Sequence, residues 1–243
     1  MTNFDSKLPL VPHGWDRIDG LLCGFGDRRV AAPPSTVLLR EQVHGDRVID
    51  ADATPIREGN GCRDGYARLD ADADAVVVTG AGCVAGVRTA DCVPILLVAP
   101  HRHWAAAVHA GWRGTIAAIA ARAVERAVAA GVAAADLHAA LGPSIGACCY
   151  EVSAELARRF GDQGHAVVER DGQQPHLDLR AINTAILVSA GVPAAHIQSC
   201  GPCTRCACDR YHSFRAQPGS PGRQISWIGW QGRTRPADPT PTR

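Results

Sequence analysis

Long apolar runs are missing from this sequence. No apolar stretch approaches the roughly 20 residues that a helix needs to cross a bilayer, which excludes a membrane-spanning class of protein. The first ten residues include Asp5 and Lys7 and lack the continuous apolar centre of a secretory signal. We therefore expect a cytoplasmic protein without a membrane partner, in a compartment where thiols stay reduced.

An excess of charge of one sign is also missing. The formal net charge is +1 over 243 residues, so no general attraction to nucleic acid or to a membrane surface is expected. Lysine is nearly absent, since Lys7 is the only one, and the other basic side chains are arginines. The planar arginine fork suits phosphate and carboxylate groups. Composition therefore indicates a soluble globular protein that does not bind nucleic acid.

Internal repeats and domain linkers are absent as well. Residues 1–14 and the Pro-, Thr- and Arg-rich residues 233–243 have the composition of flexible ends. Nothing between them is long enough to separate independent units. We expect residues 15–232 to form a single catalytic domain, in a monomer or a small homo-oligomer.

Short apolar segments and helical patterns follow one another without strict alternation. Runs of strand length occur at residues 37–39, 75–79, 83–87, 93–98, 104–108, 137–141 and, with a period of two, 225–230. Helical patterns cover residues 115–130, 152–159 and 178–190, with Thr115 as a cap and Gly131 and Gly191 as stops. Residues 55–71, rich in Gly, Arg and Asp, are expected to form a surface loop. This order predicts an α+β (mixed α/β) fold, in one compact domain with mixed sheets flanked by helices.

Cysteine is plentiful for a reducing compartment, with ten residues in all. Cys148 and Cys149 are adjacent, and four more cysteines form a C-x2-C-x2-C-x-C pattern: Cys200, Cys203, Cys206 and Cys208. Clustering favours metal binding or local redox chemistry over a disulfide framework. The pattern resembles a structural zinc or iron–sulfur ligand set, but its last spacing is tight for one tetrahedral ion. Incidental thiols are therefore the favoured interpretation.

Three segments carry the residues with the clearest chemistry: QVHG (42–45), TADC (89–92) and VHAGWRG (108–114). They supply His44, Cys92 and His109, a thiolate and two imidazoles that suit a borderline-soft cation such as zinc. Three protein ligands leave one coordination position open for water or substrate. Cys92 and His109 are also a possible nucleophile and base. Taken singly, each residue is more simply a packed side chain, and spacing alone leaves both functions open.

Eight segments, in order, resemble one protein family. They are QVHG (42–45), ADADAVVVTG (71–80), TADCVPILL (89–97), VHAGWRGT (108–115), LGPSIGACCYEV (141–152), LDLRAIN (177–183), SFR (213–215) and GRQ (222–224). The family is that of the purine nucleoside phosphorylases long described as laccase-like multicopper polyphenol oxidases. The resemblance runs from about residue 20 to residue 229.

The resemblance implies a fold, a metal centre and an activity. It places metal ligands at His44, Cys92 and His109, with zinc as the expected ion and copper in some members. It implies phosphorolysis of adenosine, inosine and methylthioadenosine to free base and a ribose 1-phosphate, with deamination of adenosine as a side activity. The expected fold resembles that of a toxin that is a cysteine deamidase. Cys203-Thr204 matches a family pair, whereas Cys200, Cys206 and Cys208 are read as additions.

The same resemblance suggests roles for further residues. Phosphorolysis passes through an oxocarbenium-like sugar and needs phosphate held beside the anomeric carbon, for which Arg113, Arg215 and Arg223 are the candidates. Deamination needs a carboxylate that moves protons, and Asp91 and Asp74 are the candidates, although an aspartate in a turn at a strand end is more often a cap or a residue that orients a ligand. Besides the metal ligands, we therefore expect Asp91 and Arg113 to take part in catalysis, together with Cys92.

Three other functions remain open on the sequence alone. A copper polyphenol oxidase would need several copper ions. A cysteine amidase or peptidoglycan-editing hydrolase would use Cys92 and His109. A metal-sensing or scaffold protein would bind zinc without turnover.

Overall fold

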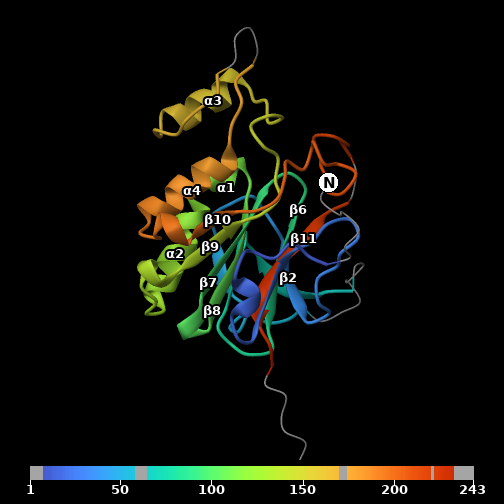
Figure 1. The fold of residues 1–243 in the computed structure, drawn as a ribbon, viewed down its shortest axis with the longest axis vertical. Helices are drawn as coiled ribbons and strands as arrows, with labels where there is room; N and C mark the ends of the chain where they lie inside the picture. The colour runs from blue at the N-terminus through green and yellow to red at the C-terminus, as the bar shows by residue number, and fades with distance from the viewer. Residues whose placement is uncertain (1–7, 58–64, 170–173, 220–221, 233–243) are drawn as a thin grey trace, which may run out of the picture.

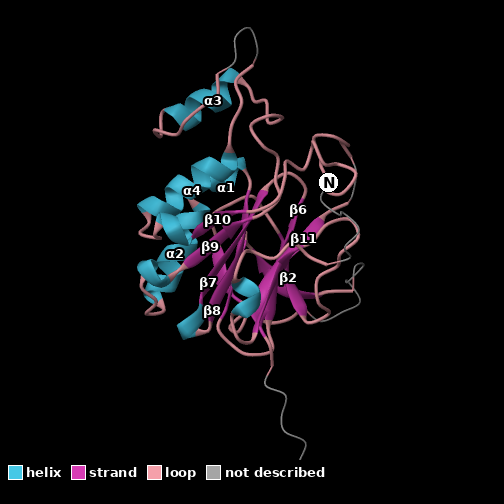
Figure 2. Cartoon of the chain, in the orientation of Figure 1, coloured by secondary structure: helices cyan, strands magenta, loops and turns pink. Residues whose placement is uncertain are grey.

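Two β-sheets and one layer of helices build the computed structural model, which describes residues 8–57, 65–169, 174–219 and 222–232 (Figures 1 and 2). The first sheet has the order β1 (Leu21–Phe25), β11 (Gln224–Trp230), β6 (Val84–Thr89), β2 (Thr36–Glu41) and β4 (Ala67–Asp72). The second has the order β10 (Ile197–Ser199), β9 (His138–Leu141), β7 (Val93–Ala99), β8 (Trp104–Ala110), β5 (Ala75–Val78) and β3 (Val48–Asp50). Both sheets contain parallel and antiparallel pairs, which confirms the predicted α+β class with mixed sheets.

The helices are α1 (Trp112–Ile116), α2 (Ile119–Ala129), α3 (Ala154–Gly161) and α4 (Leu179–Ser189). Short 3-10 helices occur at Trp15–Arg17, Pro100–Arg102, Ala134–Asp136 and Ala194–His196. In Figure 1, α1, α2 and α4 cover the outer face of the second sheet, and α3 lies farther out beyond α1. Among the residues described, no helix has the length and apolar character needed to cross a lipid bilayer.

The second sheet is the middle layer, and its strands are buried on both faces. Along β7, Ile95 and Leu97 pack in a core shared with the helices, whereas Leu96 and Val98 pack in a core shared with the first sheet. Every residue of β7 and β8 is buried. Such strands have continuous apolar sequences instead of an alternation, which is why these segments were recognisable.

The predicted helix over residues 115–130 is wrong in one respect, because the structure divides it into α1 and α2. Ala118 separates them with a left-handed backbone, at φ 57°. Thr115 is not a cap: it is buried inside α1, and its hydroxyl oxygen accepts a hydrogen bond from Asn183 Nδ2 at 2.9 Å. Gly131 follows α2 at φ 81° and ends the helix as predicted.

The predicted loop over residues 55–71 is also wrong in part. Residues 67–72 form β4, which pairs in parallel with β2 and buries Leu69 and Ala71. Residues 58–64 lie outside the described residues. The charged residues of β4 hid the strand, because Arg68, Asp70 and Asp72 alternate with apolar ones in a short segment.

The two later helices agree with their predictions within two residues at either end. Ser153 caps α3 by accepting the Leu156 backbone N–H, and Asp178 caps α4 by accepting that of Ala181. Gly191, which follows α4, has φ 97° and serves as the predicted stop.

The N-terminal segment differs from its expected flexibility over residues 8–14. Leu10 exchanges two backbone hydrogen bonds with Phe25, at 3.1 and 2.9 Å, and the His13 N–H donates to Gln198 Oε1. These bonds join the segment to the end of β1 and to β10. Residues 1–7 and 233–243 lie outside the part of the chain that the structure describes.

Candidate metal centre and its cavity

The structure brings His44, Cys92 and His109 together. Cys92 precedes β7 and His109 lies near the end of β8; these strands are antiparallel neighbours, with Val93 opposite Ala110. His44 lies in the turn after β2, which belongs to the other sheet. The ligand atoms of the three side chains all lie within 4.8 Å of one another. The two imidazole rings meet edge to face, with their centroids 4.8 Å apart.

Asp74 is the residue that arranges this cluster. Its side chain is fully buried, and Oδ1 lies 2.7 Å from His109 Nδ1. The same carboxylate accepts the backbone N–H groups of His44, at 2.9 Å, and Gly45, at 2.7 Å. These bonds hold His44 in a left-handed conformation, at φ 61°. A carboxylate at Nδ1 keeps the proton on that nitrogen and leaves Nε2 of His109 to bind a metal.

The electrostatics of the cluster favour charged forms. Burial raises the pKa of Asp74, but hydrogen bonds from His109 and from the Gly45 and His44 amides outweigh burial and lower it below its usual value. Burial likewise raises the pKa of Cys92, yet the charge of His109 and hydrogen bonds from both histidines bring it down to about 6. Burial lowers the pKa of His109, but Cys92 and Asp74 raise it to about 9. The cluster is therefore built to hold a thiolate, the form of cysteine that binds metals and attacks electrophiles.

The residues present fit a catalytic metal ion. Two imidazoles and one thiolate are ligands that zinc accepts, and three protein ligands leave an open position. Gly111 keeps the space between the ligands clear, because a Cβ atom there would lie 3.0 Å from Cys92 Sγ and 3.1 Å from His44 Cδ2. Asp74 provides the carboxylate behind a histidine ligand that is usual in such sites.

The cluster opens into a cavity of about 550 Å³, a size suited to a small molecule. Three arginines and three aromatic residues contribute to its lining: Arg88, Arg215, Arg223, Trp112, Tyr150 and Phe214. Burial raises the pKa of Tyr150 to about 12, with a further increase from the charge of Cys92, so its phenol stays protonated. The cavity therefore combines cationic groups, aromatic faces and a neutral hydroxyl.

Asp91 lies in the wall of this cavity, with a left-handed backbone at φ 90°. Its Oδ1 accepts a hydrogen bond from the Thr204 hydroxyl at 2.6 Å, and its Oδ2 accepts the Arg215 backbone N–H at 2.7 Å. The Asp91 carbonyl also accepts the Ile145 N–H. Asp91 thus connects three loops around the cavity, and both of its carboxylate oxygens already have protein donors.

The three arginines expected to bind phosphate differ in position. Arg215 and Arg223 line the cavity, with Nη1 of Arg215 donating to the Glu151 carbonyl at 2.9 Å and Nη1 of Arg223 donating to that of Gly222 at 2.8 Å. Arg113 is exposed and is not among the residues that line the cavity. Its guanidinium lies 4.4 Å from the centre of the Trp112 ring.

Sequence reasoning missed Arg88, Tyr150 and Phe214 as cavity residues. Arg88 directly precedes the TADC segment, and the other two fall within the LGPSIGACCYEV and SFR segments. Their segments were recognised, but a cavity wall depends on which side chains face it, and neither propensity nor spacing reveals that.

The cysteine-rich segment neither forms a ligand set by itself nor consists only of isolated thiols. Cys203 and Cys206 lie next to Cys148 and Cys149, whereas Cys200 packs against the core between the two sheets. Cys208 belongs neither to this group of four cysteines nor to the group of His44, Cys92 and His109. The C-x2-C-x2-C-x-C interpretation is therefore wrong about the partners, because the chain brings a distant loop to these cysteines.

Comparison with known proteins places these features in a wider context. A family model described as "Multi-copper polyphenol oxidoreductase laccase" matches residues 27–231. A purine nucleoside phosphorylase of Deinococcus radiodurans is 36% identical over 191 residues, which cover 77% of this chain and 68% of that protein. An adenosine deaminase, RL5, from an unknown prokaryotic organism is 41% identical over 160 residues, covering 64% of this chain and 61% of its own length.

A solved structure has a similar fold. The crystal structure of YlmD from Geobacillus stearothermophilus superposes with a TM-score of 0.77 at 26% identity, covering 93% of this chain and 97% of that one. In sequence, the purine nucleoside phosphorylase YlmD of that organism is 34% identical over 206 residues, which cover 82% of this chain and 74% of the relative.

Proposed function

This chain belongs to the family described as multi-copper polyphenol oxidoreductase laccase, and on that premise we propose that it cleaves purine nucleosides by phosphorolysis at a zinc centre. Adenosine deamination is the proposed further reaction. Relatives named purine nucleoside phosphorylase and adenosine deaminase support the substrate class. One observation carries the proposal: a His2Cys ligand set opens into a cavity with arginine and aromatic walls.

The metal would be held by His44, Cys92 and His109, and when bound it would supply positive charge and an open coordination position at the cavity. Asp74 keeps His109 oriented and in the tautomer that can coordinate. The donor atoms of the cysteine and both histidines lie within 4.8 Å of one another, although the residues come from segments of two different sheets.

Phosphate binding is assigned to the arginines of the cavity. Attack on the anomeric carbon requires a dianion held beside a sugar that becomes positively charged as the bond to the base breaks. Arg215 and Arg223 can offer paired N–H donors to phosphate oxygens. Arg215 is itself fixed by Asp91 and the Glu151 carbonyl, so little freedom remains to be lost when phosphate binds.

Purine binding is assigned to the aromatic residues. Trp112, Tyr150 and Phe214 offer flat apolar faces within the cavity wall. Phe214 is half exposed; contact of its apolar ring with water is unfavourable, and a stacked base would cover the ring. The protonated Tyr150 hydroxyl can donate a hydrogen bond to the purine as it leaves.

Product analysis tests this proposal. Zinc-loaded protein is incubated with adenosine, inosine or methylthioadenosine, with and without phosphate, and free base is separated from deaminated nucleoside. We expect base release that depends on phosphate and yields equal amounts of a sugar 1-phosphate. Deaminated product without any base release, or no turnover at all, would contradict phosphorolysis.

A cysteine hydrolase is the second candidate, because one observation favours it. Cys92, His109 and Asp74 have the spatial arrangement of nucleophile, base and orienting carboxylate that is found in covalent catalysis. Alkylation of Cys92 that zinc blocks and nucleosides do not affect would favour this function. A copper oxidase has less support, since only one of the two groups of potential metal ligands among the described residues contains histidine.

A further inference from the structure

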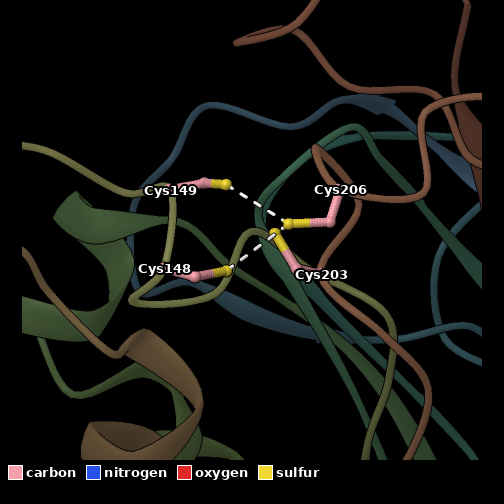
Figure 3. A group of neighbouring side chains, drawn as sticks. All are labelled: Cys148, Cys149, Cys203 and Cys206. Carbon is pink, nitrogen blue, oxygen red and sulfur yellow. Dashed lines mark hydrogen bonds between the residues drawn. The ribbon is translucent and has the colours of Figure 1, made fainter.

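Four cysteine side chains meet at a second place in the molecule, apart from the metal centre (Figure 3). Cys148 and Cys149 come from the loop between β9 and α3, and Cys203 and Cys206 come from the turn after β10. The Sγ atom of Cys206 lies 3.6 Å from that of Cys148 and 3.4 Å from that of Cys149. All four sulfurs lie within 4.8 Å of one another.

These separations suit one tetrahedral cation. Four thiolates at about 2.3 Å from a zinc ion lie about 3.8 Å from one another. The separations of Cys206 Sγ from the sulfurs of Cys148 and Cys149 are close to that value and well above the roughly 2.05 Å of a disulfide. Cys203 and Cys206 also have the C-x2-C spacing that is common in structural zinc sites.

Backbone donors surround one of the sulfurs as they do in metal–thiolate sites. The Gly146 N–H donates to Cys203 Sγ at 3.3 Å, and the backbones of Arg205 and Cys206 add further hydrogen bonds to the same sulfur. Such donors stabilise the negative charge that a metal-bound thiolate retains.

We propose that Cys148, Cys149, Cys203 and Cys206 form a second metal site that binds a single zinc-class divalent cation. On binding, the four thiols lose their protons to solvent and ligate as thiolates. The ion joins two loops that contribute to the cavity wall. Tyr150, which lines the cavity, directly follows Cys149, and Thr204, which holds Asp91, directly follows Cys203. The second metal therefore stabilises the two loops of the cavity wall and takes no part in the reaction.

Metal content tests this proposal without reference to activity. The full chain is loaded with zinc under reducing conditions, freed of loose metal by gel filtration, and its zinc is measured by mass spectrometry. The variants Cys148→Ser and Cys206→Ser change exposed residues of the cluster, Cys208→Ser is a matched control outside it, and Cys92→Ser/His109→Ala removes the first centre. Circular dichroism establishes that each variant is folded.

We expect two zinc ions per chain in the wild type and in Cys208→Ser, and one in each of the other variants. Combining Cys206→Ser with Cys92→Ser/His109→Ala is expected to leave none. With cobalt in place of zinc, the chain without the first centre should keep strong sulfur-to-metal charge-transfer bands, which Cys206→Ser should remove.

Several results would overturn the second site. Equal zinc in the wild type, Cys206→Ser and Cys208→Ser would show that the four thiols do not bind it. A disulfide among them that persists in reducing, zinc-containing buffer would show redox chemistry instead. Iron and inorganic sulfide bound to the purified protein would show that the four cysteines hold an iron–sulfur cluster and not a single cation. None of these results bears on nucleoside cleavage at the first centre.

Discussion

Asp74 shows how one buried side chain can organise a candidate metal centre. Its two carboxylate oxygens contact the ring of one proposed ligand and the backbone of the turn that carries another. The sequence left Asp74 open as a proton shuttle or as an orienting residue, and full burial and three hydrogen bonds favour the orienting role. That role depends on residues 30 and 35 positions away along the chain, so spacing did not reveal it.

Asp74→Asn should weaken zinc binding about 10–100-fold, because the amide loses the negative charge and presents a donor to an N–H of the turn. Competition with a chromogenic chelator measures the affinity. Asp72→Asn is the control, since Asp72 is partly exposed and pairs with Arg40 in a surface ion pair. Equal affinities in the two variants would contradict the role assigned to Asp74.

Arg223 and Arg113 provide a second test at the scale of single residues. Arg223 lines the cavity and Arg113 does not, although both were expected from the sequence to bind phosphate. Arg223→Met should raise the KM for phosphate about tenfold or more, from the loss of a charged hydrogen bond, and change the KM for adenosine much less. Arg113→Met should leave both constants near the wild-type values. A larger effect on phosphate from Arg113→Met would reverse the assignment.

At the scale of elements, the turn between α1 and α2 is the feature that the sequence hid. Neither Gly nor Pro marks the break, because Ala118 takes the left-handed conformation that glycine usually supplies. The break ends α1 after five residues and lets Thr115 meet Asn183 of α4. An alanine-rich stretch has no local signal for such a turn, and tertiary contacts determine it.

Ala118→Gly should therefore stabilise the protein by about 0.5–1 kcal/mol, because relief of the left-handed strain exceeds the added entropy of the unfolded chain. Gly131→Ala should destabilise it by about 1 kcal/mol or more. A Cβ atom at Gly131 would meet no atom within 4 Å, so this cost comes from the backbone alone. Urea unfolding of zinc-saturated protein measures both changes, and the same sign for the two would refute the explanation.

Strands were predictable where burial is uniform and not where it is mixed. The strands β5 and β7 of the middle sheet are apolar throughout, β8 is apolar except for His109, and their segments were recognised. Strand β4 was not, because its charged residues face away from the core. Similarly, β1 and β10 are short and only partly buried, and their sequences carry little signal.

At the scale of the whole molecule, the layered fold explains how the site forms. Two proposed ligands lie at one end of adjacent strands in the middle sheet, and the third comes from a turn of the outer sheet. The three proposed ligands were selected from their chemistry and from the family resemblance. Their meeting, and that of Cys148 and Cys149 with Cys203 and Cys206, required the topology, because no local pattern states which distant segments become neighbours.

The central claim is that nucleoside cleavage depends on the metal held by His44, Cys92 and His109. The most direct measurement compares phosphate-dependent base release from adenosine by the wild type and by a Cys92→Ala/His109→Ala variant of equal fold, both loaded with zinc in the same way. The account predicts release by the wild type and a loss of at least about a hundredfold in the variant, since metal centres supply several kcal/mol of transition-state stabilisation. Full turnover by this variant, which lacks two of the three proposed ligands, would contradict the account.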